Sequence, residues 1–454
     1  MRFVPLALAL SAALVAPAHA ADAPKKTDTK DAQIEDLASR IKALEANAQA
    51  LQQQAAEALA AAQAAQAELQ KMKATQQETA VASVAAAPAA AAPGASSSAN
   101  VFNPAISIIL NGFYEHHSQN PDTYQRAGFP LAGEGRPGEQ GFHLGESEVS
   151  FASNIDDKFY GQLTVTMSDE GGETHTGVEE AFIDTTALPD GFTLRAGRFF
   201  SNIGYLNSHH AHTDYFSDRP LAYQAFLGNQ YGDDGVQLRW VAPTDTYLEL
   251  GSEVFRGNNY PSGGAEHSGA GVKTLFAHAG GDVGVENSWL AGISMLHSEG
   301  SGADDGFSGR DNLYLADFTW KYAPRGAFKD AGVVLRSEYF VDDRKGDVLD
   351  LADPTAPPQY WDGERRGAYV EGLYKFSRTW DVGYRYDKLW AASHGPYASD
   401  YDPQRHNAMV TWHNSEFSLF RLQYSHDEPQ AHMIDNVLTL QYQVSLGAHG
   451  AHKF

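Results

Sequence analysis

Apolar and polar residues alternate along much of the chain after residue 105, and the clearest run is residues 438–446. There Leu, Tyr or Val fills every second position, and Thr, Gln or Ser fills the positions between them. A period of two describes a β-strand with one apolar face and one polar face. Beyond the amino-terminal segment no stretch is apolar enough to cross a membrane as a helix, so any membrane crossing would use strands.

The alternating segments are separated in turn by short and by long, hydrophilic gaps, which predicts an all-β transmembrane barrel of about 16 antiparallel strands over residues 103–454. Hairpin-sized gaps lie at residues 154–157, 189–191, 243–245 and 377–379. Strands leaving the short-turn side are expected to begin at Ile106, Lys158, Phe192, Tyr247, Ser288, Ala331, Trp380 and Phe417. Returning strands are expected near Phe142, Thr176, Val236, Val272, Leu313, Gly367, His406 and Asn436. The last strand would end on the aromatic Phe454, as closing strands of outer-membrane barrels commonly do.

Alternation also predicts which side chains face the lipid and which face the lumen. Apolar stripes such as Leu163, Val165 and Met167, or Val382, Tyr384 and Tyr386, should point outward. Charged residues at the intervening positions should line a water-filled lumen, and carboxylates outnumber basic groups among them. They are Glu146, Glu148, Arg239, Glu249, Glu253, Asp317, Arg336, Glu338, Glu371, Lys375, Asp381, Arg385 and Asp387. The register of the strand around Glu179 and Glu180 stays ambiguous.

Three regions are expected before the barrel. Residues 1–20 have a positive start, an apolar core and an Ala18-His19-Ala20 cleavage site, which predicts a signal peptide. Residues 21–80 contain a coiled-coil core at 31–73, because apolar or Ala residues recur at spacings of three and four. Residues 81–102 form an Ala/Pro/Ser linker.

The coil is expected in the periplasm, where its narrow apolar seam predicts self-association. The seam by itself leans toward dimers, and the Ala-rich second half specifies the number of chains weakly. The alternative is a single Ala-rich helix that lies on the barrel or on the cell wall, with peptidoglycan as a partner.

Composition narrows the function. There are 57 acidic against 33 basic residues, a formal net charge of −24, and no cysteine. These values exclude a disulfide scaffold, a thiolate metal site and a cysteine nucleophile, and they argue against a nucleic-acid partner. No catalytic or phosphate-binding motif is present, so we expect a protein that is not an enzyme and has no cofactor.

The gap of roughly 35 residues between Phe199 and Val236 is the most unusual local sequence. A loop of this length in a porin-like barrel is expected to fold inward and narrow the pore. Its side chains His209, His210, His212 and Asp214 are ligand types that suit zinc or a related metal. The alternative is a polar extracellular loop in which the histidines are neighbours without a common ligand.

Five stretches resemble a proteobacterial porin-like outer-membrane family related to the phosphate-selective porins, some members of which are labelled zinc-regulated TonB-dependent outer membrane receptor. They are NPAISIILNG (residues 103–112), FHLGESE (142–148), EEAF (179–182), AGRFF (196–200) and GNQYGDDG (228–235). The resemblance implies a homotrimeric outer-membrane barrel. The chain departs from true TonB-dependent receptors because it has no plug-like pattern before the barrel. It departs from phosphate pores because its predicted lumen is acidic.

The sequence therefore predicts an outer-membrane, porin-like channel for small hydrophilic solutes, cation-leaning and linked to zinc or another divalent metal. Two alternatives stay open: an outer-membrane receptor for a metal or metal chelate, and an envelope tether or adhesin that works through the coil.

Overall fold

The computed structural model describes residues 104–170, 173–264, 269–300, 303–351, 353 and 355–447. The predicted signal peptide, coiled coil, linker and terminal Phe454 lie outside these residues. No helix among the described residues is long and apolar enough to cross a membrane.

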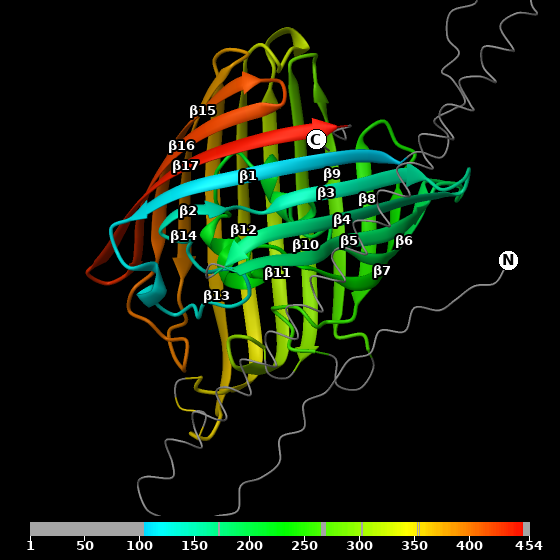
Figure 1. The fold of residues 1–454 in the computed structure, drawn as a ribbon. Helices are drawn as coiled ribbons and strands as arrows, with labels where there is room; N and C mark the ends of the chain where they lie inside the picture. The colour runs from blue at the N-terminus through cyan, green and yellow to red at the C-terminus, as the bar shows by residue number, and fades with distance from the viewer. Residues whose placement is uncertain are drawn as a thin grey trace, which may run out of the picture. The chain divides into compact units, whose positions relative to one another are not determined.

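The described residues form one closed antiparallel β-barrel (Figure 1). Its strands are β1 (Ala105–His117), β2 (Gly141–Leu144), β3 (Ser147–Asn154), β4 (Phe159–Glu170), β5 (Glu173–Thr185), β6 (Phe192–Phe200), β7 (Gly232–Val241), β8 (Tyr247–Phe255), β9 (Val272–Val283), β10 (Asn287–Gly300), β11 (Phe307–Tyr322), β12 (Gly332–Val348), β13 (Gln359–Lys375), β14 (Trp380–Trp390), β15 (Gln404–Ser415), β16 (Ser418–Gln430) and β17 (Met433–Gly447). Short helices lie in the connections: η2 (Pro121–Thr123), η3 (Leu206–Ser208), η4 (Ala211–Thr213), α2 (Leu221–Leu227) and η5 (Pro324–Gly326).

Each strand pairs with its neighbours in sequence, and β17 returns to β1, where Leu110 lies opposite Val444. The strands β2 and β3 both pair with β1 and share one position in the ring, so the barrel has 16 strand positions. The predicted strand number is confirmed. The strands that leave the short-turn side begin within a residue of their predicted starts, whereas returning strands begin earlier in most cases; the one placed at Gly367 begins at Gln359.

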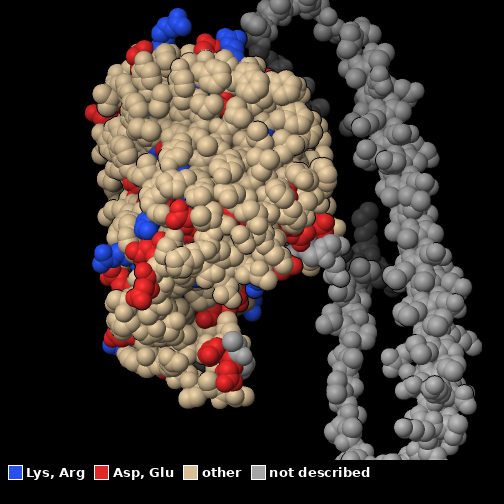
Figure 2. Space-filling view, turned by 90° about the vertical axis from the view of Figure 1, so that its left-hand side faces the viewer, with Lys and Arg blue, Asp and Glu red and all other residues tan. Residues whose placement is uncertain are grey.

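The outer surface is apolar, as alternation predicts. Val382 and Tyr384 on β14 are exposed, whereas Asp381 and Arg385 on the same strand are buried. Figure 2 shows a wide belt on one face in which almost no charged side chain is present, with charged residues gathered above and below it. Apolar outward and polar inward is the arrangement of a barrel that spans a bilayer.

Aromatic side chains form a continuous band at the short-turn end. Trp380 pairs with Trp412, Trp412 with Phe420 and Phe420 with Tyr442 across four adjacent strands, β14 to β17. Their ring centroids lie 6.1, 5.8 and 4.3 Å apart. Such a girdle positions a barrel at the boundary between hydrocarbon and headgroups.

The opposite end of the barrel is densely packed. Arg344 on β12 is fully buried and pairs with Asp305, with Asp311 at 2.9 Å and with Asp342 at 3.3 Å. Arg365 on β13 also bonds Asp342, and its guanidinium lies 4.4 Å from the ring centroid of Tyr397. These contacts join the long connections between strands to the barrel wall.

Candidate functional site

The connection between β6 and β7, residues 201–231, enters the lumen instead of extending from the rim. Its first turn reaches the far wall, where Gly204 N–H donates to Ser294 Oγ on β10 at 3.1 Å. Its helix α2 is buried along its whole length, and Tyr223 and Phe226 pack against Phe340 of β12. The prediction of an inward-folded loop is confirmed. We call residues 201–231 the inward loop.

A second attachment of the inward loop lies at Asp218. Its carboxylate accepts hydrogen bonds from Arg385 at 3.1 Å, Arg405 at 2.7 Å and Gln423 at 2.6 Å, on the strands β14, β15 and β16. Burial raises the pKa of Asp218, but the two guanidinium groups lower it more, and the net pKa lies below the ordinary value. The loop is therefore anchored by a charged group as well as by apolar packing.

The wall that faces the loop on the other side contains two irregularities. On β5 the pairing with β4 shifts between Thr164 and Val165, so Glu179 is an extra residue in a β-bulge. The bulge turns the carboxylates of both Glu179 and Glu180 toward the lumen, where each lies within ion-pair distance of His210. A break between β2 and β3 places Glu146 beside Glu148 in the same region. The bulge resolves the register that the sequence left ambiguous.

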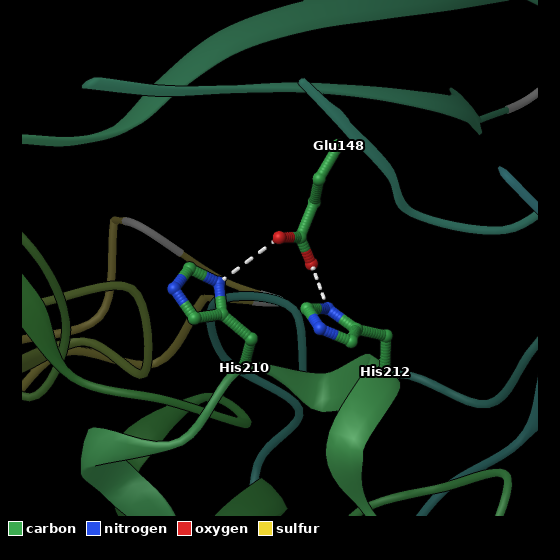
Figure 3. A group of neighbouring side chains, drawn as sticks. All are labelled: Glu148, His210 and His212. Carbon is green, nitrogen blue, oxygen red and sulfur yellow. Dashed lines mark hydrogen bonds and ion pairs between the residues drawn. The ribbon is translucent and has the colours of Figure 1, made fainter. Parts of the chain in front are cut away.

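Two imidazoles of the inward loop meet these carboxylates. Glu148 Oε1 lies 2.6 Å from His212 Nδ1, and Glu148 Oε2 lies 3.2 Å from His210 Nδ1 (Figure 3). His210 Nδ1 also lies 3.1 Å from Glu179, and its Nε2 lies 3.0 Å from Glu180. We call Glu146, Glu148, Glu179, Glu180, His210 and His212 the His–Glu cluster.

The carboxylates of the cluster favour the protonated, positively charged form of His210. Burial lowers the pKa of His210, but the contacts with Glu148, Glu179 and Glu180 raise it, and the net pKa lies well above the ordinary 6.5. Ligand atoms of Glu148, His210 and His212 all lie within 4.8 Å of one another, as do those of Glu146, Glu148 and Glu179. Imidazole nitrogen and carboxylate oxygen in one place are donors that suit zinc and related metals.

The set predicted from the sequence, His209, His210, His212 and Asp214, is not brought together, and this is a correction. His209 turns away because its Nδ1 lies 2.7 Å from the Tyr205 carbonyl and its ring stacks on that tyrosine. Asp214 points to the other side of the loop, where it pairs with Arg219 at 2.8 Å. Only His210 and His212 share the cluster, and their partners are glutamates from the wall. Strand parity indicated Glu148, but nothing in the sequence joined it to the loop.

The thirteen residues predicted to face the lumen all lie on the inner side of the barrel wall or, for Glu146, at the β2–β3 break. Many of them hold the inward loop or pair with each other. Glu338 and Glu253 accept hydrogen bonds from loop backbone N–H groups, and Arg336 pairs with Glu371 at 2.7 Å. Their burial follows from the loop, which fills lumen space that the sequence assigned to water.

Cavities remain beside the inward loop toward the short-turn end. One has a volume of about 640 Å³, and Glu148, Glu180, His210 and His212 are among its lining residues. We call it the cluster cavity. A second, of about 410 Å³, lies next to Tyr205, Arg239, Glu249 and His278. A third, of about 300 Å³, adjoins Asp214 and Arg421. The loop thus narrows this half of the lumen without filling it.

Comparisons with known proteins support the fold. No protein-family model matches the chain. An uncharacterized protein of Aquifex aeolicus is 29% identical over 403 residues, covering 79% of this chain and 81% of that protein.

Among solved structures, the OmpF of Salmonella typhi in complex with daunomycin superposes with a TM-score of 0.53 at 14% identity, covering 76% of this chain and 99% of OmpF. The outer membrane channel DcaP of Acinetobacter baumannii gives a TM-score of 0.49 at 12% identity, covering 76% of this chain and 97% of DcaP. The superposition on OmpF shows that the barrel has the fold of outer-membrane porins.

Proposed function

We propose that this protein is a porin-type channel of the outer membrane, through which small hydrophilic solutes pass without energy input. The observation that carries the proposal is the inward loop, which crosses the lumen but leaves cavities of about 640, 410 and 300 Å³ beside it. A loop that only sealed the barrel would not leave open space on both of its sides. The exposed apolar belt and the aromatic girdle support outer-membrane lipid as the surroundings.

The channel is proposed to prefer cations. The carboxylates of Glu148, Glu180 and Asp184 outnumber the guanidinium groups of Arg195 and Arg239 in the lining of the cluster cavity. A water-filled passage lined by more carboxylates than guanidinium groups concentrates cations.

The working assembly is proposed to be a homotrimer, as the resemblance implies, with the amino-terminal coil in the periplasm. A link between this channel and zinc or another divalent metal, which the resemblance implies, also stays a prediction. Native mass spectrometry of the mature chain in detergent measures the assembly directly. A strictly monomeric barrel, unchanged by deletion of residues 31–73, contradicts it.

Planar-bilayer recording of the purified chain tests the channel. Stable ohmic steps, with a reversal potential that favours cations in a salt gradient, are the expected result. The competing function is a receptor that captures a metal or metal chelate. One observation favours it: in the long-loop half of the barrel, buried ion pairs such as Arg344 with Asp305 hold connecting segments against the wall. Electrically silent protein that binds a metal chelate would establish the receptor in place of the channel.

A further inference from the structure

The His–Glu cluster contains more carboxyl groups than basic side chains. Four carboxylates, those of Glu146, Glu148, Glu179 and Glu180, meet two imidazoles. The nearest guanidinium on β6, Arg195, is held by Asp184 in a two-pronged contact at 2.7 and 2.8 Å. Carboxyl groups therefore outnumber imidazole rings by two to one within the cluster, and no free guanidinium from the fully described strand β6 is directed at them.

Buried atoms of the cluster also lack satisfactory hydrogen bonds. Glu146 Oε1, Glu179 Oε2 and His210 Nδ1 are buried, yet none of them makes a hydrogen bond of good geometry. His210 Nδ1 lies 3.1 Å from Glu179 Oε2 and 3.2 Å from Glu148 Oε2, so it takes part in ion pairs without a well-aligned hydrogen bond. Buried polar atoms are normally hydrogen-bonded, and a metal ion placed among these atoms would satisfy them.

The spacing of these atoms fits a metal ion of the zinc type. Ligand atoms about 2.1 Å from a tetrahedral metal stand roughly 3.4 Å apart. The contacts of Glu148 with His212 and His210 and of His210 with Glu179 measure 2.6, 3.2 and 3.1 Å, so side-chain shifts of less than about 1 Å would make room for the ion. Calcium and magnesium prefer oxygen ligands throughout, whereas a mixed nitrogen and oxygen set suits zinc, copper or nickel.

We propose that Glu148, His210 and His212, completed by Glu179, bind one divalent transition-metal ion that fastens the inward loop to the barrel wall. The loop is already attached to β12 through Glu338 and to β14–β16 through Asp218. Glu148 and Glu179 belong to β3 and β5, so the metal joins the loop to a third part of the wall. The ion would also occupy the side of the cluster cavity that Glu148, His210 and His212 line. If the protein conducts ions as proposed above, the bound metal regulates its conductance.

Binding is measured first, independently of conduction. Zn²⁺ is titrated into the metal-free, purified full-length protein in detergent by isothermal calorimetry. We expect one site per chain, weakened at least about tenfold by each of Glu148→Gln, His210→Asn and His212→Asn, since even supporting contacts of metal sites are worth that much. His209→Asn is the matched control, because this neighbouring ring stacks on Tyr205 outside the cluster. It should bind Zn²⁺ as the wild type does.

Conductance is measured second, on the same preparations. Zn²⁺ should lower the single-channel conductance of the wild type and of His209→Asn, and leave that of His210→Asn/His212→Asn unchanged. Heat-modifiable migration on gels confirms that each variant is folded; if Glu148→Gln fails to fold, Glu179→Gln takes its place.

The two proposals fail in different ways. Ohmic channels that bind no Zn²⁺, or equal weakening by His209→Asn and His210→Asn, overturn the metal site and leave the channel standing. Zn²⁺ binding without any conduction overturns the channel and the regulation while the site survives. Zn²⁺ binding to a channel whose conductance does not change overturns the regulatory role.

Discussion

Glu338 on β12 accepts a hydrogen bond from the backbone N–H of Tyr205 at 3.0 Å, although the two residues are 133 positions apart in the sequence. The same carboxylate accepts from Leu206 N–H at 3.2 Å and from the hydroxyls of Tyr223 and Tyr369. One buried side chain thus fixes the start of the inward loop, its helix and the neighbouring strand.

Replacing Glu338 with Ala removes the acceptor for these four donors. Each donor left buried without a partner costs about 1–3 kcal/mol, so the barrel should lose at least about 2 kcal/mol of stability. The loop should also become susceptible to protease, and the conductance should rise. Glu364→Ala, at an exposed position on β13, is the control and should change neither. Unaltered conductance in a folded Glu338→Ala channel would show that the loop is held elsewhere.

The carboxylate of Asp218 predicts how the inward loop responds to low pH. The pKa of Asp218 is lowered in the folded protein, because the effect of Arg385 and Arg405 outweighs that of burial. Its contribution to stability is therefore fully present above the unfolded pKa of about 3.9. That contribution is lost as the pH falls through the lower pKa of the folded protein. Asp387 and Asp427 also face these arginines and compete for them. Below about pH 4 the loop should loosen on the β14–β16 side, and conductance should become noisier.

Asp218→Asn should remove part of that acid response, since it no longer titrates. Recording wild type and variant between pH 6 and pH 3 makes the comparison. Identical pH profiles for the two proteins would exclude Asp218 as the titrating anchor.

Arg344 and Lys345 are adjacent and differ completely in surroundings. Arg344 is fully buried among Asp305, Asp311 and Asp342, whereas Lys345 and Asp362 form an exposed pair. Arg344→Ala leaves buried carboxylates without their cation and should cost about 3–5 kcal/mol. Lys345→Ala should leave the unfolding transition where it is. Both are read from urea unfolding in detergent micelles; equal midpoints for the two variants contradict the prediction.

Ion selectivity tests the acidic cavity. Glu180→Gln should reduce the cation preference measured as a reversal potential, because this carboxylate lines the cluster cavity. Asp190→Asn, in the turn before β6, is the control for a simple loss of net charge. An anion-preferring wild type would contradict the predicted sign outright.

The barrel could be predicted because its signal is local and repeated. Period-two alternation places Val382 and Tyr384 outside and Asp381 and Arg385 inside, and turns at short spacing fix where strands begin. Returning strands such as β13, which begins at Gln359, start earlier than predicted because backbone pairing continues through residues that do not follow the apolar alternation.

The site could be predicted only in part. The histidine-rich sequence indicated a ligand, but a row of neighbouring residues in a loop does not reveal which way each ring turns. His210 and His212 face the wall, whereas His209 is taken by the Tyr205 carbonyl. The extra carboxylate at Glu179 comes from a β-bulge, and alternation assigns such a residue to the wrong face.

The inward loop also stiffens the barrel against deformation from the side. A ring-shaped wall without internal support flattens easily into an ellipse when it is pressed from the side. This loop touches β10 at Ser294, β12 at Glu338, β14 at Arg385 and β3 at Glu148, which lie on different parts of the circumference. The loop therefore connects several sides of the wall across the lumen. Under the lateral pressure of the surrounding bilayer, these connections keep the cross-section of the barrel from flattening.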